Sequence, residues 1–287
     1  MKNHFFISML AAAALLGGLT ACNGKLDKAP RADQVPENAV RITASIGNPF
    51  AATRSMPLGT EEEQGKFNVG DEIFVSTPGL QRATYRFDGT VWVPKEGKYL
   101  LWKEDMERFN AYYPAESGEN PFSYVHPTDQ SSTEKIAKAD LMSVGLDQAK
   151  TKEALHFTMR RRTTRLIVEI AGFKSEFPGD AKVENVRFLN KANASAPLRT
   201  YIPYAKGEGK TGSTYTVLVP WDAAHNTISL EVGGKTMTAK LSEFTYDSGL
   251  SYTYRLTVGK EKLETTEVTV SDWTGSAVIP GGEAKAN

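Results

Sequence analysis

The sequence contains a single cysteine, Cys22, among 287 residues. One thiol cannot form an intramolecular disulfide, so a stable fold has to come from burial of apolar side chains. The sequence also lacks an excess of either charge, with 34 Lys and Arg against 34 Asp and Glu. Nucleic acids and anionic membrane surfaces are usually bound by strongly basic proteins. The charge balance therefore favours a protein or sugar partner.

Recognisable catalytic patterns are also missing. The four histidines, His4, His126, His156 and His225, are widely separated, and the sequence contains neither an HExxH pattern nor a GxSxG elbow. The sequence therefore predicts a protein that is not an enzyme and uses no metal or cofactor. Carboxylate pairs can come from distant residues, so a cell-surface hydrolase stays as an alternative.

The longest apolar run, Phe5 to Leu19, is shorter than the roughly 20 residues that span a bilayer. It follows Lys2 and ends in small residues, which is typical of an export signal. The next residues, Leu19-Thr20-Ala21-Cys22, resemble the lipobox of bacterial lipoproteins. This resemblance implies a signal peptide over residues 1–21 and a lipid attached to Cys22; the alternative is an incidental cysteine. Residues 22–38 are polar and predict a flexible tether.

Beyond the tether, short segments alternate apolar and polar residues and are separated by Gly, Pro, Asn and Asp, which predicts an all-β protein. The predicted strands include residues 40–46, 72–76, 83–87, 165–170, 215–219, 227–232, 235–241, 252–258 and 267–270. Asp88-Gly89 and Gly233-Gly234 predict hairpin turns. Residues 207–212 fit a GxGxxG pattern, but a β-like run follows them, which favours a hairpin loop over a nucleotide site.

The number of short strands predicts two β-sandwich-like domains, at residues 39–162 and 163–287. The predicted boundary lies at Arg160-Arg161-Arg162, which we interpret as a solvated connection between domains. Aromatic residues in alternating strands are mostly expected in the core. The alternative for Trp92, Trp102 and Trp221 is stacking on sugars, which would make the protein a monomeric surface glycan-binding lipoprotein.

Several segments, in this order, resemble the fimbrillin family of Bacteroidales, the lipoprotein precursors of type V pilins. They are "FNVGDEIFV" (67–75), "FNAYYP" (109–114), "YTYRLTV" (252–258) and "VTVSDW" (268–273). The resemblance implies two transthyretin-like β-sandwich domains, an anchor in the outer membrane, and export to the cell surface and the fimbrium. It also implies cleavage by an arginine-specific protease in the loop after the first strand. Subunits then assemble with one another by strand exchange and contribute to adhesion.

The residues that would serve this mechanism can be assigned along the chain. Val40, Ile42, Ala44 and Ile46 share one face of the first predicted strand and would plug the groove. The loop that follows contains Arg54, so the predicted cleavage site is the bond between Arg54 and Ser55; the alternative is an uncleaved surface arginine. The predicted donor residues lie near the C-terminus: Val268, Val270, Val278 and Ile279.

Overall fold

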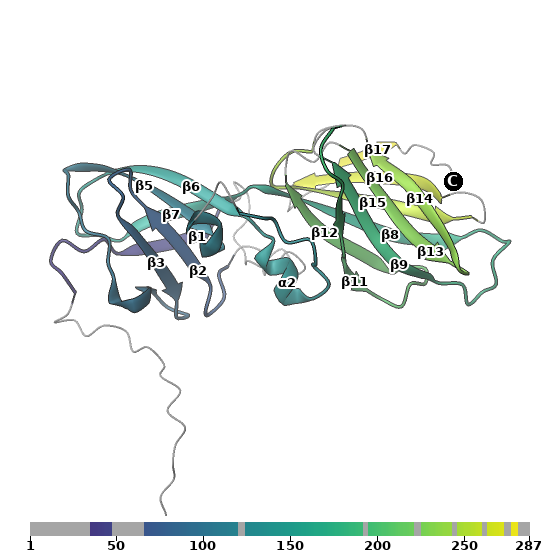
Figure 1. Ribbon diagram of the computed structural model, residues 1–287, viewed down its shortest axis with the longest axis horizontal. Coiled ribbons are helices and arrows are strands. Elements are labelled where there is room, and N and C mark those ends of the chain that lie inside the picture. Colours follow the sequence, from purple (N-terminus) through teal and green to yellow (C-terminus); the bar gives the residue numbers. More distant parts are fainter. Residues whose placement is uncertain are drawn as a thin grey trace, which may run out of the picture.

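The computed structural model describes residues 35–47, 66–119, 124–191, 195–220, 225–242, 246–259, 263–272 and 277–280 (Figure 1). For residues 225, 242, 264–272 and 277–280 only the backbone is described. Five residues singled out from the sequence, His4, Cys22, Arg54, Ser55 and Trp221, lie outside these ranges.

The N-terminal part of the chain forms a seven-stranded sheet in the order β1-β7-β6-β5-β2-β3-β4. These strands are β1 (Ile42–Ile46), β2 (Glu72–Ser76), β3 (Arg82–Phe87), β4 (Trp92–Pro94), β5 (Met106–Tyr113), β6 (Met142–Ala149) and β7 (Leu155–Arg161). Neighbouring strands are antiparallel except for β1, which runs parallel to β7. Because β1 forms an edge of the sheet, its hydrogen bonds to another strand come from β7 alone.

The helices are short. They are α1 (Ala115–Glu119), α2 (Thr133–Lys138) and a 3-10 turn at Lys95–Gly97. The Ser132 hydroxyl caps α2 by accepting a hydrogen bond from the backbone N–H of Lys135. In Figure 1, α2 lies between the two groups of sheets.

The C-terminal part contains a four-stranded sheet, β10-β9-β13-β14, and a six-stranded sheet, β11-β12-β8-β15-β16-β17. The strands are β8 (Thr163–Phe173), β9 (Val183–Lys191), β10 (Arg199–Tyr201), β11 (Tyr204–Lys206), β12 (Thr214–Pro220), β13 (His225–Val232), β14 (Lys235–Ser242), β15 (Leu250–Val258), β16 (Leu263–Asp272) and β17 (Ala277–Pro280). The all-β class predicted from the sequence is confirmed.

Two large apolar cores are present. One is built from buried residues between Val40 and Met159, and the other from buried residues between Leu166 and Leu263. The alternation of the strands explains both cores, since each strand turns one face inward: β7, for example, buries Leu155, Phe157 and Met159. Strands before Arg162 belong to the N-terminal sheet and core, and strands after it belong to the C-terminal sheets and core. The division into two domains at this residue remains a prediction.

The predicted turns are confirmed. Asp88 and Gly89 connect β3 to β4, and the Asp88 carboxylate accepts hydrogen bonds from the N–H groups of Thr90 and Val91. Gly233 and Gly234 connect β13 to β14, and both have positive φ angles that favour glycine. Residues 207–212 connect the antiparallel strands β11 and β12, so the GxGxxG match is a hairpin loop.

Candidate functional site

The segment from Asn38 to Gly47 links two separate stretches of backbone in the N-terminal part. At its start, the N–H of Val40 donates to the carbonyl of Leu100 (2.8 Å), and the N–H of Trp102 donates to the carbonyl of Asn38 (2.9 Å). From Ile42 onward the segment pairs instead with β7. Removing it would therefore leave unpaired backbone groups at Leu100–Trp102 and along β7.

The inward face of this segment is apolar. Val40, Ile42 and Ile46 are 0%, 3% and 5% exposed, and Ala44 is half-buried against the same core. Burial of one aliphatic side chain of this size contributes roughly 1.5–3 kcal/mol. The Tyr85 hydroxyl also donates to the Val40 carbonyl (2.9 Å). The inward side chains of this segment therefore cover part of the N-terminal core.

The outward face of β1 is held to β7 by a histidine. Nδ1 of His156 lies 3.0 Å from the Thr43 hydroxyl, and Nε2 lies 2.8 Å from the Ser45 hydroxyl. Thr43 is directly opposite His156 in the strand register. The Thr43 hydroxyl also donates to the Leu155 carbonyl (3.4 Å). With that bond in place, Nδ1 of a neutral imidazole donates to Thr43 and Nε2 accepts from the Ser45 hydroxyl. Sequence reasoning missed this role of His156, because no sequence pattern indicates that β1 and β7 are neighbours.

The end of β1 also fits closely against β7. The N–H of Gly47 donates to the carbonyl of Met159 (2.7 Å). A Cβ atom at position 47 would collide with Cγ2 of Thr158. Glycine is therefore the residue that allows the chain to leave β1 at this point without displacing the Thr158 side chain.

The predicted donor residues lie in two adjacent strands of the six-stranded sheet. Val268 and Val270 are in β16, which pairs with β15 on one side and β17 on the other. Val278 and Ile279 are in β17, the strand at the edge of this sheet. In this structure the predicted donor segment is thus already paired within its own chain.

The two groups of sheets meet through the segment before α2. Gln130 is fully buried; its side-chain Nε2 donates to the carbonyl of Leu218 (2.7 Å), and its Oε1 accepts from the N–H of Leu218 (2.7 Å). Its backbone N–H donates to the carbonyl of Ile202 (2.9 Å). Ile136 and Ala139 of the α2 region pack with Leu218 in a small separate core.

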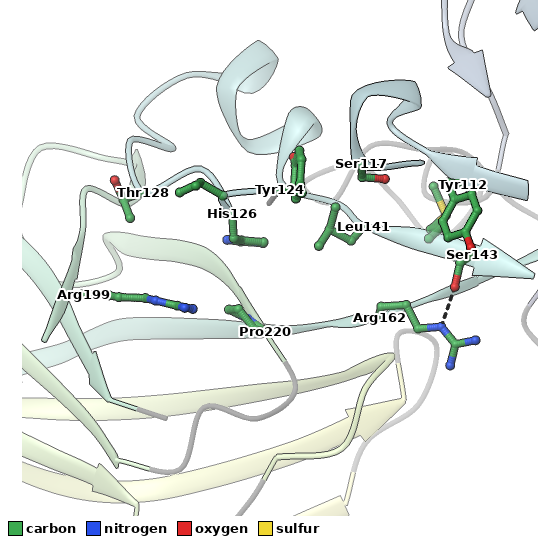
Figure 2. Close-up of a pocket in the computed structure, with 12 residues that line it drawn as sticks. Tyr112, Ser117, Tyr124, His126, Thr128, Leu141, Ser143, Arg162, Arg199 and Pro220 are labelled. Atoms are coloured by element: carbon green, nitrogen blue, oxygen red, sulfur yellow. Dashed lines mark hydrogen bonds between the residues drawn. The ribbon is translucent and has the colours of Figure 1, made fainter. Parts of the chain in front are cut away.

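A pocket of about 500 Å³ lies at this junction. In Figure 2, Tyr124 and His126 lie on one wall, and Arg199 and Pro220 lie on the opposite wall. Nε2 of His126 donates to the carbonyl of Ala139 (2.9 Å). Burial lowers the pKa of His126 to about 4, so its ring is neutral at pH 7. No aspartate or glutamate is among the described residues that line this pocket, so it offers no carboxylate pair for hydrolysis.

The arginine cluster differs from the prediction of a solvated connection. Arg161 is buried, and its Nε donates to both carboxylate oxygens of Asp140, at 3.0 and 3.2 Å. Burial raises the pKa of the fully buried Asp140 carboxyl, while the guanidinium of Arg161 acts in the opposite direction. Arg160 and Arg162 are exposed, and Nε of Arg162 donates to the Ser143 hydroxyl (2.8 Å).

The sugar-stacking alternative for the tryptophans is wrong for two of them. Trp92 is 7% exposed and packs edge-on against Phe67, and Trp102 is 4% exposed and packs edge-on against Phe109. Both rings belong to the N-terminal core and present no free face to a sugar. Across the described ranges, His, Cys, Asp and Glu form no group of three that could hold a metal ion. No helix in the described part of the chain is long and apolar enough to cross a membrane.

A family model for fimbrillin-like proteins matches residues 60–273. The chain belongs to the fimbrillin-like family. Among solved structures, this fimbrillin-like chain is similar to a candidate cell adhesion protein from Bacteroides ovatus ATCC 8483, with a TM-score of 0.54 and 13% identity over 88% of this chain and 99% of that chain. A candidate cell adhesion protein from Bacteroides uniformis ATCC 8492 has a TM-score of 0.51 and 16% identity over 82% of this chain and 98% of that chain. At these identities the likeness shows a shared fold. No protein with a curated description matches the sequence.

Proposed function

We propose that this chain is the precursor of a fimbrial subunit that assembles at the cell surface by strand exchange. The observation that carries the proposal is the position of residues 38–47. This segment is buried on its apolar face, forms an edge of its sheet, and is joined to the remainder of the chain by the loop that contains Arg54. An edge strand is hydrogen-bonded to one neighbouring strand only, so it can leave without breaking backbone hydrogen bonds on two sides.

In this proposal, Cys22 carries a lipid that holds the precursor at the outer membrane. An arginine-specific protease cuts the bond between Arg54 and Ser55, which removes the covalent link between β1 and the remainder of the fold. The groove then accepts a strand from another subunit through main-chain hydrogen bonds and apolar side chains. The C-terminal residues Val268, Val270, Val278 and Ile279 are the proposed source of that strand. β17 is an edge strand, so its departure breaks pairing on one side only, whereas β16, which holds Val268 and Val270, has to separate from both β15 and β17.

Fimbrial assembly requires no chemistry from the chain itself. The role proposed here is structural, with other fimbrial subunits as partners and no cofactor. Membership of the fimbrillin-like family and the shared fold with candidate cell adhesion proteins both support this role.

Limited digestion tests the proposal. The unlipidated chain from Asn23 is treated with an arginine-specific protease, and the products are analysed by N-terminal sequencing and by size. We expect a new N-terminus at Ser55, followed by oligomers that resist denaturant. Arg54→Ala should prevent both, whereas Arg160→Ala, which removes an arginine exposed on a strand, should prevent neither. A chain that is cut after Arg54 and stays monomeric would contradict the proposal.

A further inference from the structure

We infer that His156 sets the register of the strand seated beside β7, and that a strand replacing β1 has to present the same pair of hydroxyl groups. The first part concerns β1 in the intact chain. The second part rests on the proposed function, because it concerns the strand that enters after β1 has left. The inference starts from the two hydrogen bonds that join His156 to Thr43 and Ser45, at 3.0 and 2.8 Å.

The apolar face of β1 cannot set the register alone. Val40, Ile42, Ala44 and Ile46 alternate along the strand and are all apolar. A shift by one residue would turn these side chains to the solvent, so that shift is excluded by burial. A shift by two residues would again place apolar side chains against the core. Burial therefore distinguishes odd shifts from even ones, and some other contact has to distinguish the even shifts from one another.

The histidine supplies that distinction. In the observed register the imidazole lies between two hydroxyls, those of Thr43 and Ser45. A shift by two residues places either Arg41 or Ser45 opposite His156. In the first case the neighbouring outward residue is Thr43, and in the second it is Gly47, so only one hydroxyl is close to the ring. The observed register is the one in which both ring nitrogens have hydroxyl partners.

Gly47 marks the same register independently. Any side chain at the position of Gly47 would collide with Cγ2 of Thr158. The site beside β7 therefore accepts a strand of defined chemistry. It has apolar residues alternating with Thr and Ser, it runs parallel to β7, and it ends in a residue without a side chain or stops before that point.

The sequence contains this order twice. The pattern apolar, Thr, apolar, Ser occurs at Ile42–Ser45 and again at Val268–Ser271, inside the proposed donor region. In a second copy of this chain, Thr269 and Ser271 would take the places of Thr43 and Ser45 beside His156, with Val268 and Val270 facing the core. Asp272 and Trp273 would fall at the positions of Ile46 and Gly47, so we expect the seated segment to end at Ser271.

Hydrogen exchange of the uncut chain tests the role of His156 directly. In His156→Val, which keeps a good strand former, the amide of Gly47, which donates to the Met159 carbonyl, and the amides of β1 that donate to β7 should exchange about tenfold faster, as expected for loss of two modest hydrogen bonds. Replacing both hydroxyls, as Thr43→Val with Ser45→Val, also removes the hydrogen bond from Thr43 to the Leu155 carbonyl (3.4 Å) and should have at least the same effect. Adding His156→Val to this pair should add nothing further. His156→Gln should restore part of the protection. The exposed Arg160→Val on the same strand is the matched control and should leave exchange over β1 unchanged.

An unchanged exchange rate in His156→Val, or an additive triple variant, would overturn the inference. Neither outcome depends on cleavage at Arg54, so this experiment decides the role of His156 even if the proposed function fails.

Peptide competition tests the partner chemistry. The chain from Cys22, with Arg31→Lys and Arg41→Lys so that the label stays joined to β1, is labelled at this cysteine and cut after Arg54. Peptides are then added to displace the labelled fragment. A peptide of residues 38–47 should compete about tenfold better than its form with Thr43→Val and Ser45→Val, and this preference should vanish on His156→Val chains. The peptide of residues 266–272 should likewise compete better on the wild-type chain than on the His156→Val chain. A preference that persists without His156 overturns the inference, whereas failure of every peptide to displace the fragment contradicts the proposed function.

Discussion

His126 is a histidine that the fold keeps neutral. Its ring is buried at the junction of the two groups of sheets, and its pKa falls from 6.5 to about 4 because burial disfavours the charged form. The unfolded chain takes up a proton near pH 6.5, whereas the folded chain does so near pH 4. The contribution of His126 to stability is therefore complete above pH 6.5 and is lost as the pH falls toward 4.

This difference leads to a prediction for acid stability. His126→Gln keeps a donor for the Ala139 carbonyl but cannot titrate. Between pH 7.5 and 4.5 the free energy of unfolding of the wild type should fall by up to about 3 kcal/mol more than that of the variant. Denaturant unfolding at the two pH values measures both quantities, and an equal loss in the two proteins would show that the histidine stays accessible to protons.

Other single residues show the limit of sequence reasoning at this scale. Arg161 looked like part of a solvated basic cluster, but Asp140 neutralises it inside the protein at a separation of 21 residues. The sequence places Asp140 next to a short helical segment and gives no sign of this pairing. In contrast, the burial of Trp92 and Trp102 was expected, since large aromatic side chains of an all-β protein mostly lie in its core.

The strand β1 is the element on which the proposed assembly depends. Ile42 is buried in the N-terminal core, while its neighbour Arg41 is exposed. Ile42→Ala should lower the free energy of unfolding by about 2–4 kcal/mol and speed hydrogen exchange along β7, because its edge partner β1 is packed less tightly. Arg41→Ala should change stability by no more than about 0.5 kcal/mol. If the two substitutions have equal effects, β1 is not a packed part of this core.

Regular alternation made several strands predictable but not all of them, since β7 alternates strictly between buried and exposed residues and was not among the predicted strands. The prediction for residues 72–76 coincides with β2, and the hairpins at Gly89 and Gly233 follow from turn chemistry. β9 was missed because Asn185 has a positive φ and the pairing with β13 shifts register, which breaks the alternation. β1 begins at Ile42 and not at Val40, because the backbone N–H of Val40 donates to the carbonyl of Leu100 and not to β7.

The candidate site was predictable only in part. Alternation indicates which residues of β1 face inward, but it does not indicate which strand lies beside them. β1 pairs in parallel with β7, more than 100 residues later, and a parallel pair leaves no hairpin signal between its strands. For this reason His156 and Thr158 could not be assigned to the site from the sequence.

The whole molecule is held together at the contact between its two cores. Gln130 spans this contact with two side-chain hydrogen bonds of 2.7 Å to the backbone of Leu218. Gln130→Leu would leave the buried N–H and carbonyl of Leu218 unpaired, at a cost of about 2–4 kcal/mol. We expect calorimetry to resolve separate unfolding transitions of the two groups of sheets in this variant.

Another glutamine of the N-terminal part provides a matched control. Gln148 of β6 makes one exposed hydrogen bond, to the Ala149 carbonyl. Gln148→Leu should keep the wild-type unfolding profile. A profile for Gln130→Leu that matches this control would mean that Gln130 does not couple the two groups of sheets.

The central claim is that β1 leaves its chain after cleavage and that another chain fills its place. The most direct measurement uses the single cysteine. The unlipidated chain from Cys22, with Arg31→Lys and Arg41→Lys so that no arginine lies between the dye and β1, is labelled with a dye at Cys22, cut with an arginine-specific protease, and separated by size. The account predicts that the dye elutes with a small fragment ending at Arg54, while the high-mass oligomers carry no dye and begin at Ser55. Oligomers that retain the dye in proportion to their protein would contradict it, because β1 would still occupy the groove.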